Sequence, residues 1–528
     1  MKQLRGFFDC KTGILCDNSC DVVKYSDESI EVLIFGRVET EDGINNIPEI
    51  VSAFSGKKES FTEKVNGIYI CMFYDKINKT MSVFHDRTTS SATFYYAEKD
   101  EKVYFSTSLK SVLVDSGIER KLNNNVIEEF ITNGFIYGKE TLCENIFKLE
   151  AFKSLFISNS GIEIKKSEYS VKEMSKGEAL NGFNSALENA VKKCIIDKNN
   201  VSLPLSGGYD SNYIAHIVSD NNCKNVTAFS IGGKFGKSEL PIVESNIKYY
   251  NGFGLKTALT KDDTLQNFPD IVWRLEGSVY EVGLFLQYEL ASLVKNSGKK
   301  SLICGECADQ VFNKFYFCKD RLFPEKKNEP TYYEFSEYPY IFGSFVILKK
   351  NGILANSFGI ETFYPFLDND VLDVAKPLGE INGKDKRVHV ANCNERFKKE
   401  VLGNMKKVGG STDCHSLFNS KEEISSFINK IENSDFFRKN EEMIKKHSLS
   451  EKEKQTGFLK LKTDIRNIVF DILGIGKKSR DGSRYFTEEM KLREYMCIAY
   501  IILFEKLILS GDFDLNNEVL NKSFNEIL

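Results

Sequence analysis

The sequence contains no long hydrophobic run, few histidines and no marked excess of either charge. Its longest apolar run, Met496–Phe504, is far shorter than the roughly 20 residues that span a bilayer, so we predict a buried C-terminal helix. Only five of the 528 residues are histidine, which disfavours a histidine-based catalytic centre. The 71 Lys and Arg against 75 Asp and Glu give a net charge of -4, which provides no general attraction for nucleic acid or an anionic membrane.

Cysteine is present but scattered. The thirteen cysteines do not form a disulfide framework, and no secretory signal pattern opens the sequence, so we expect reduced thiols and a cytoplasmic protein. Cys304 and Cys307 form a C-x-x-C pair. Zinc normally requires a second pair at comparable spacing, and none is evident. Redox or sulfur chemistry at this pair therefore stays a minor alternative.

Strand and helix patterns divide the chain into two predicted domains, 1–170 and 171–528. The first contains short β-branched and aromatic runs separated by turn-like segments, which indicates an antiparallel, β-rich domain. In the second, strand-like runs alternate with helical segments, which indicates βαβ units and a doubly wound parallel sheet. From about residue 370 the chain is mainly helical. We therefore predict a two-domain α/β protein.

The second predicted domain begins with a helix. Leu180, Phe183, Leu187 and Ala190 recur at helical spacing, and we expect them to share one buried face.

A glycine turn follows the next predicted strand, "VSLPL". Ser206, Gly207 and Gly208 end the apolar run, and Asp210 and Ser211 follow directly. Ligands of open parallel sheets bind beyond the carboxyl ends of the strands. Glycines there can adopt positive φ and let the backbone approach an anion, while the following helix contributes its positive end. An acid in such a turn is best explained by Mg²⁺, although a plain Gly-Gly loop with a capping side chain has the same composition.

The string S-G-G-x-D-S resembles the pyrophosphate-binding loop of the ATP pyrophosphatases, which cleave ATP to AMP and pyrophosphate. It is not a Walker A motif, because no lysine follows the glycines. Two further boxes, "SLICGECADQVFNKF" at Ser301–Phe315 and "FYPFLDNDVLDVA" at Phe363–Ala375, are similar to segments of the asparagine synthetase-like family. "AFSIGG" and "WRLEG", which contains Glu276, also resemble family segments. They lie in the family's order between the S-G-G-x-D-S string and the box at Ser301–Phe315. This family includes β-lactam and carbapenam synthetases and lasso-peptide cyclases.

The segment Asn66–Leu113 resembles the end of the family's glutamine-amidotransferase domain, which implies an Ntn-type (αββα) fold for residues 1–170. In working amidotransferases the chain starts M-C-G-I-x-G, and the cysteine is the nucleophile. Here Gly6 aligns with the glycine, and Lys2 occupies the cysteine position. Lysine has no thiolate, and its unperturbed pKa of about 10.4 keeps it protonated. We therefore expect an inactive glutaminase domain.

The resemblance also assigns roles to residues of the synthetase domain, 171–528. It implies a pyrophosphate cradle in the glycine turn, Mg²⁺ ligation by two aspartates, and adenosine contacts from residues for which core packing is an equal alternative. The cradle comprises Ser206, Gly207, Gly208, Asp210 and Ser211; the metal ligands are Asp210 and Asp309; the adenosine contacts are Leu203, Ile231, Cys304 and Gly305.

Catalytic roles are implied for a lysine and a glutamate. Lys407 falls near the family's conserved lysine, which stabilises charge on the α-phosphate and the tetrahedral intermediate; Lys406 is its neighbour and is not distinguished from it. Lys386 is a weaker candidate for a second phosphate contact, because a solvated face is the commoner fate of a lysine. Glu306 stands where β-lactam-forming relatives have a tyrosine, and it is a candidate base or contact for the substrate amine.

The function that these expectations favour is an ATP-dependent, AMP-forming amide ligase that uses Mg²⁺. It would adenylate a substrate carboxylate and then form an amide, with the amine in the same small molecule or peptide, giving a lactam or macrolactam in natural-product biosynthesis. The alternative is asparagine synthetase-like amidation with free ammonia or a separate amine, without glutaminase activity. A third interpretation is that the chain is a non-catalytic, nucleotide-binding partner in a biosynthetic protein complex. The motifs at Ser206–Ser211 and Glu306–Asp309 retain their metal-ligand candidates, which disfavours this interpretation.

Overall fold

The structure is a computed structural model, and part of the chain is described in it. The described residues are 2–55, 58–87, 92–167, 172–232, 238–260, 263–312, 347–382, 386–397, 401, 414–445 and 481–510.

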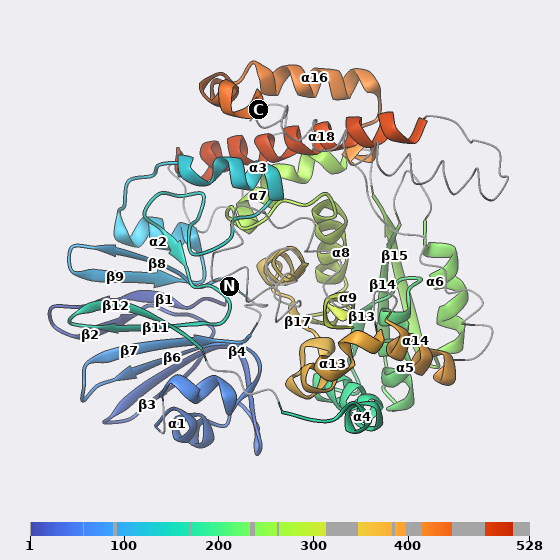
Figure 1. Cartoon of the computed structure of the whole chain (residues 1–528), viewed down its shortest axis with the longest axis horizontal. Coiled ribbons are helices and arrows are strands. Elements are labelled where there is room, and N and C mark those ends of the chain that lie inside the picture. Colours follow the sequence, from blue (N-terminus) through green and yellow to red (C-terminus); the bar gives the residue numbers. More distant parts are fainter. Residues whose placement is uncertain are drawn as a thin grey trace.

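The N-terminal part consists of two antiparallel β-sheets that face each other (Figure 1). One sheet has the strand order β10-β8-β9-β1-β2 and the other β12-β11-β7-β6-β4-β3, with β5 paired to β4. The strands of the first are β1 (Arg5–Asp9), β2 (Ile14–Asp17), β8 (Tyr95–Lys99), β9 (Lys102–Ser106) and β10 (Phe147–Lys148). Those of the second are β3 (Val23–Ser26), β4 (Ile30–Thr40), β5 (Gly43–Ile44), β6 (Asn66–Asp75), β7 (Thr80–His85), β11 (Lys153–Ser158) and β12 (Gly161–Lys166). The expected antiparallel, β-rich N-terminal part is confirmed.

Side-chain alternation along the strands explains why both faces of each sheet are covered. On β4, Leu33 and Phe35 point between the sheets, whereas Val32 and Ile34 pack against helix α1 (Ile47–Ser55) on the outside. On β8, Tyr96 faces the other sheet, and its neighbours pack with helix α2 (Leu109–Ser116) on the opposite face. The order of layers is therefore helix, sheet, sheet, helix.

The second part contains parallel strands. Strands β13 (Ser202–Pro204), β14 (Val226–Gly232) and β15 (Phe253–Leu259) form one parallel sheet, and β16 (Ser301–Ile303) pairs in parallel with β17 (Glu361–Phe363). The Ser202 hydroxyl donates to the Ser301 carbonyl at 2.5 Å, so β13 and β16 lie next to each other.

Helices cover both faces of these strands. Ala228 of β14 packs with α4 (Lys176–Cys194) and α5 (Tyr209–Asp220), whereas Phe229 packs with α8 (Leu284–Asn296) on the opposite side. The remaining helices that position the site are α6 (Leu240–Asn246), α7 (Phe268–Leu275), α9 (Ala308–Phe312), α13 (Asn369–Asn382) and α14 (Arg387–Arg396). The carboxyl ends of β13 and β16 therefore open onto the starts of α5 and α9.

Helix α4 differs in one respect from the sequence prediction. It begins with a capping box between Ser175 and Glu178, and Phe183, Leu187 and Ala190 are buried as expected. Leu180, however, is 45% exposed, and the fully buried Ala179 completes the face instead. A helix face is three to four residues wide, so the spacing alone did not decide which of two adjacent residues faces the core.

The C-terminal helix α18 (Asp481–Phe504) runs below α16 (Lys421–Glu432) and above α3 (Ile127–Asn133) and α7 in the view of Figure 1. Every residue of Met496–Phe504 is at most 2% exposed, which confirms the predicted buried helix. Among the described residues, no helix combines the length and hydrophobicity that crossing a bilayer requires.

Candidate functional site

The glycine turn joins β13 to α5. The Ser206 N–H donates to the Ser211 hydroxyl at 3.1 Å, and the Gly208 N–H donates to the Ser206 hydroxyl at 3.2 Å. Asn212 braces the turn from inside, because its amide donates to the carbonyls of Ser206 and Gly208 at 2.9 and 2.7 Å. Sequence reasoning missed Asn212; its position directly after the S-G-G-x-D-S string was the available signal.

Close packing at Gly207, rather than a left-handed backbone, accounts for a glycine in this turn. Neither Gly207 nor Gly208 has a positive φ, so that part of the prediction was wrong. A Cβ at Gly207 would lie 3.2 Å from the side chain of Ile242 in α6. The Gly207 N–H donates to the Glu239 carboxylate at 3.0 Å, so one amide of the turn already binds an oxyanion.

Asp210 and Asp309 are brought together by the two strand ends. Asp210 lies in the first turn of α5, after β13, and Asp309 lies in α9, after β16. The Lys386 ammonium contacts both Asp210 oxygens at 2.8 and 2.7 Å and Asp309 Oδ1 at 2.8 Å. The side chain of Lys386 is 11% exposed, that of Asp210 is 21% exposed and that of Asp309 is 31% exposed. The two carboxylates therefore converge on one cationic group.

Electrostatic interactions favour the charged forms of Asp210 and Lys386. Burial alone would raise the pKa of Asp210, but the charge of Lys386 and the hydrogen bond from His389 outweigh it and lower the pKa. Burial likewise would lower the pKa of Lys386, but the two aspartates raise it overall. Lys386, a weak candidate from sequence, is thus at the centre of the acid pair.

The donor set fits Mg²⁺. Carboxylate oxygens are the protein ligands this ion prefers, and Mg²⁺ usually takes one or two of them together with waters and substrate phosphates. No group of three or more metal-ligating side chains occurs within the described ranges. Asp210 and Asp309 would therefore supply two ligands, and a nucleotide and water would have to supply the rest.

Glu306 lies between β16 and α9. Burial raises its pKa. The Asn351 amide donates to Glu306 Oε1 at 2.9 Å, whereas Glu306 Oε2 and Asn351 Oδ1 are buried and have no hydrogen-bond partner among the described residues. Sequence reasoning missed Asn351, which lies in a π-helical turn at Lys349–Ile353 and outside the quoted motifs.

The predicted adenosine contacts lie in different surroundings. Leu203 is fully buried in the core with Ile303, and Cys304 is 2% exposed in the core beside α8. Ile231 is partly buried at the end of β14. A Cβ on Gly305 would lie 3.0 Å from the Ser211 nitrogen, so the second box packs directly onto the start of α5.

The other residues singled out from the sequence are not part of the acid pair. Lys406 and Lys407 are outside the described residues. Cys304 and Cys307 are both 2% exposed, and burial raises the pKa of both thiols, which disfavours thiolate chemistry. Lys2 lies 5.3 Å from the ring centre of Phe35 and lines a cavity of about 60 Å³ between the two parts of the chain.

Glu276 belongs to this contact between the two parts. It accepts hydrogen bonds from the Ser108 hydroxyl at 2.8 Å and the Leu109 N–H at 2.5 Å, and Lys110 lies 3.3 Å away. It therefore caps helix α2 of the N-terminal part rather than contacting the glycine turn.

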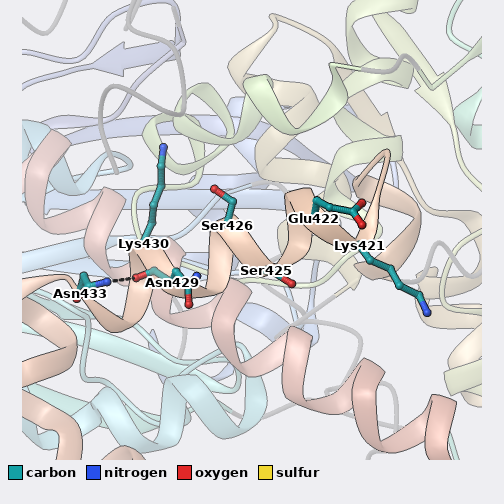
Figure 2. A pocket seen from close by; sticks show the side chains of 7 residues that line it. All are labelled: Lys421, Glu422, Ser425, Ser426, Asn429, Lys430 and Asn433. Atoms are coloured by element: carbon teal, nitrogen blue, oxygen red, sulfur yellow. Dashed lines mark hydrogen bonds between the residues drawn. The ribbon is translucent and has the colours of Figure 1, made fainter.

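A surface hollow on helix α16 does not coincide with the acid pair. Its lining comes from one face of α16 and the residue after it, as Figure 2 shows. These residues are Lys421, Glu422, Ser425, Ser426, Asn429, Lys430 and Asn433. A hollow built from one helix face lacks the convergent polar groups of a ligand site.

Comparison with known families matches both parts of the chain. An asparagine synthase family model matches residues 182–339, which contain the glycine turn, Glu306 and Asp309. A glutamine amidotransferase domain model matches residues 48–170. These two matches, together with the asparagine synthetases described next, support an asparagine synthetase-like family for this chain.

Individual asparagine synthetases are distant relatives of this asparagine synthetase-like chain. A putative glutamine-hydrolyzing asparagine synthetase of Methanocaldococcus jannaschii is 24% identical over 68% of the chain and 64% of the relative. A probable asparagine synthetase of Dictyostelium discoideum is 23% identical over 67% and 61%. Escherichia coli asparagine synthetase B is 18% identical over 67% and 60%. The chain thus spans less than two thirds of the length of these relatives.

Proposed function

We propose that the protein is an ATP-dependent, AMP-forming amide ligase that adenylates a substrate carboxylate. The observation that carries this proposal is the convergence of Asp210 and Asp309, from the ends of two neighbouring parallel strands, on one cationic group beside the glycine turn. Such a place binds a divalent cation together with a triphosphate. The proposal includes a doubly wound ATP pyrophosphatase-type domain at 171–528 and an inactive amidotransferase-like domain at 1–170.

In the first step the substrate carboxylate attacks the α-phosphate, and pyrophosphate leaves. The backbone amides and two hydroxyls of the turn from Ser206 to Ser211, which now bond within the turn and to Glu239, would be redirected to the departing phosphates. When bound, Mg²⁺ would offset phosphate charge between Asp210 and Asp309. Lys386 would exchange its carboxylate partners for a phosphate oxygen, because the cation would take those carboxylates. Lys407 is proposed to stabilise charge on the α-phosphate.

In the second step an amine attacks the acyl carbon, and AMP leaves. Glu306 is proposed to accept a proton from this amine. Burial raises its pKa, which makes the carboxylate a stronger base, and Asn351 holds Oε1 so that Oε2 stays free. Both unpaired atoms, Glu306 Oε2 and Asn351 Oδ1, are hydrogen-bond acceptors, which complements the N–H groups of an amine.

The amine is proposed to belong to the same molecule as the carboxylate, so that the product is a lactam or macrolactam of natural-product biosynthesis. Lys2 at the position of the glutaminase nucleophile supports this choice, because lysine cannot form the glutamyl thioester. The matched relatives favour the alternative, since their names describe glutamine-hydrolyzing asparagine synthetases. In that case free ammonia or a separate amine would attack.

Pyrophosphate exchange into ATP tests the first step. The purified protein is incubated with Mg²⁺, labelled pyrophosphate and a panel of carboxylates that begins with L-aspartate and peptides carrying a free amine. Asp210→Asn should abolish the exchange, whereas Asp220→Asn, at the exposed end of the same helix, should leave it unchanged. Transfer of ¹⁸O from the carboxylate to AMP should accompany product formation. Release of ADP, or full exchange by the Asp210 variant, would refute the proposal.

Mass spectrometry of the product separates the two amines. Loss of one water from a single substrate indicates cyclisation, whereas incorporation of ¹⁵N from ammonium chloride indicates amidation.

A further inference from the structure

A buried histidine, His389, contacts Asp210 of the acid pair. His389 lies in α14, one turn after Lys386, and this helix packs beside α5 (Figure 1). Its side chain is 0% exposed, and its Nε2 lies 3.1 Å from Asp210 Oδ1. Asp210 Oδ1 is thus shared by His389 and Lys386, and Lys386 also contacts Oδ2 at 2.7 Å.

Aromatic rings hold the imidazole in place. Phe312 is stacked on it with ring centres 5.1 Å apart, and Tyr213, Phe366 and Phe183 surround it at 5.4, 5.6 and 6.5 Å. These rings come from α4, α5, α9 and the segment before α13. The ring orientation is therefore determined by packing from four separate elements, and the imidazole cannot turn away from Asp210 without disturbing the core.

The surroundings also determine which nitrogen carries the proton. An ionised carboxylate only accepts hydrogen bonds, so Nε2 must be the donor. Nδ1 is buried and has no hydrogen-bond partner among the described residues, and an N–H there would be an unsatisfied buried donor. The arrangement selects the Nε2–H tautomer.

We propose that His389 is a positioning residue that fixes the Asp210 carboxylate for the divalent cation. By holding Oδ1, it leaves Oδ2 directed toward the position that Lys386 and Asp309 share. This inference rests on the proposed nucleotide site. Partners that orient a metal ligand in this way typically change metal affinity about 10- to 100-fold when they are removed.

Divalent cation affinity tests this role. Mn²⁺ binding is measured by electron paramagnetic resonance on the full chain in the presence of α,β-methylene-ATP. His389→Phe suits the aromatic surroundings but removes the donor, and we expect it to weaken Mn²⁺ binding about 10- to 100-fold. His389→Gln retains an N–H donor and should recover most of the affinity. His216→Gln, on the outer side of α5 beside Asp220, is the matched control and should bind normally.

The outcomes separate the role of His389 from the proposed function. Wild-type affinity in His389→Phe, or equal weakening in the Phe and Gln variants, overturns the inference. If the wild-type chain binds no Mn²⁺ with the analogue, the proposed nucleotide site itself is refuted. If His389→Phe does not fold, selective ¹⁵N-histidine NMR of the wild-type chain decides: the Nε2–H tautomer supports the inference, and the Nδ1–H tautomer overturns it.

Discussion

Replacing Lys386 with methionine should make the stability of the protein depend on divalent cations. The ammonium group lies within 2.8 Å of both Asp210 and Asp309, and its own side chain is 11% exposed. Methionine has a similar length but no charge. The substitution would leave two neighbouring carboxylates without their shared counter-charge.

The size of the effect follows from this burial. Removing one partner of a fully buried ion pair costs about 3–5 kcal/mol. The carboxylates are 21% and 31% exposed, so water offsets part of the loss, and we expect a decrease of about 2–3 kcal/mol in the free energy of unfolding. MgCl₂ should restore part of this loss, because a cation that binds only the folded chain stabilises it.

Urea unfolding of the wild-type and variant chains, each with MgCl₂ and with EDTA, measures both effects. Lys193→Met is the matched control, because Lys193 also contacts two aspartates, Asp368 and Asp370, but is 37% exposed. That variant should lose less than about 1 kcal/mol. Equal losses in the two variants, or a Lys386 variant that Mg²⁺ does not stabilise, would refute the reasoning about a cation site.

The contribution of the triad should also depend on pH. The folded-state pKa of Asp210 is lowered, so its contribution is present above the unfolded value of about 3.9 and is lost as the pH falls toward the folded value. The folded-state pKa of Lys386 is raised, so its contribution is present below about pH 10.4 and is lost as the pH rises through the folded value. The stability difference between wild type and Lys386→Met should therefore be largest between about pH 5 and 9 and should shrink on the acid side.

Two further predictions concern the neighbouring loop. Glu306→Gln should spare pyrophosphate exchange but reduce amide formation about 100-fold or more, because the amide cannot accept the proton from the amine; equal loss of both activities in parallel assays would contradict this role. Gly305→Ala should reduce pyrophosphate exchange and destabilise the fold by about 1–3 kcal/mol, because its Cβ would meet the Ser211 nitrogen at 3.0 Å. Gly254→Ala is the control for Gly305→Ala, because a Cβ on Gly254 would lie 3.8 Å from the nearest atom outside its neighbours, and it should change pyrophosphate exchange little. Gly298 is unsuitable as a control because it has a positive φ of 73°.

The sequence by itself determined the local features of this protein. Short β-branched and aromatic runs separated by turn-like segments predicted the antiparallel strands of the N-terminal part, and strand-turn-helix patterns predicted where β13 and β16 end. The resemblance of the two loops to the asparagine synthetase-like family, rather than chain geometry, implied that Asp210 and Asp309 would meet. The strand predictions needed only residue composition and short-range patterns along the chain.

The tertiary structure alone decided which distant residues complete the site. Lys386, His389 and Asn351 come from elements with no local motif of their own, and only packing brings them to Asp210 and Glu306. Packing also placed Ala179 rather than Leu180 in the core and directed Glu276 to helix α2. The physical reason is the same in each case: a residue's neighbours along the chain determine its backbone conformation, but the charges and rings around its side chain come from the whole fold.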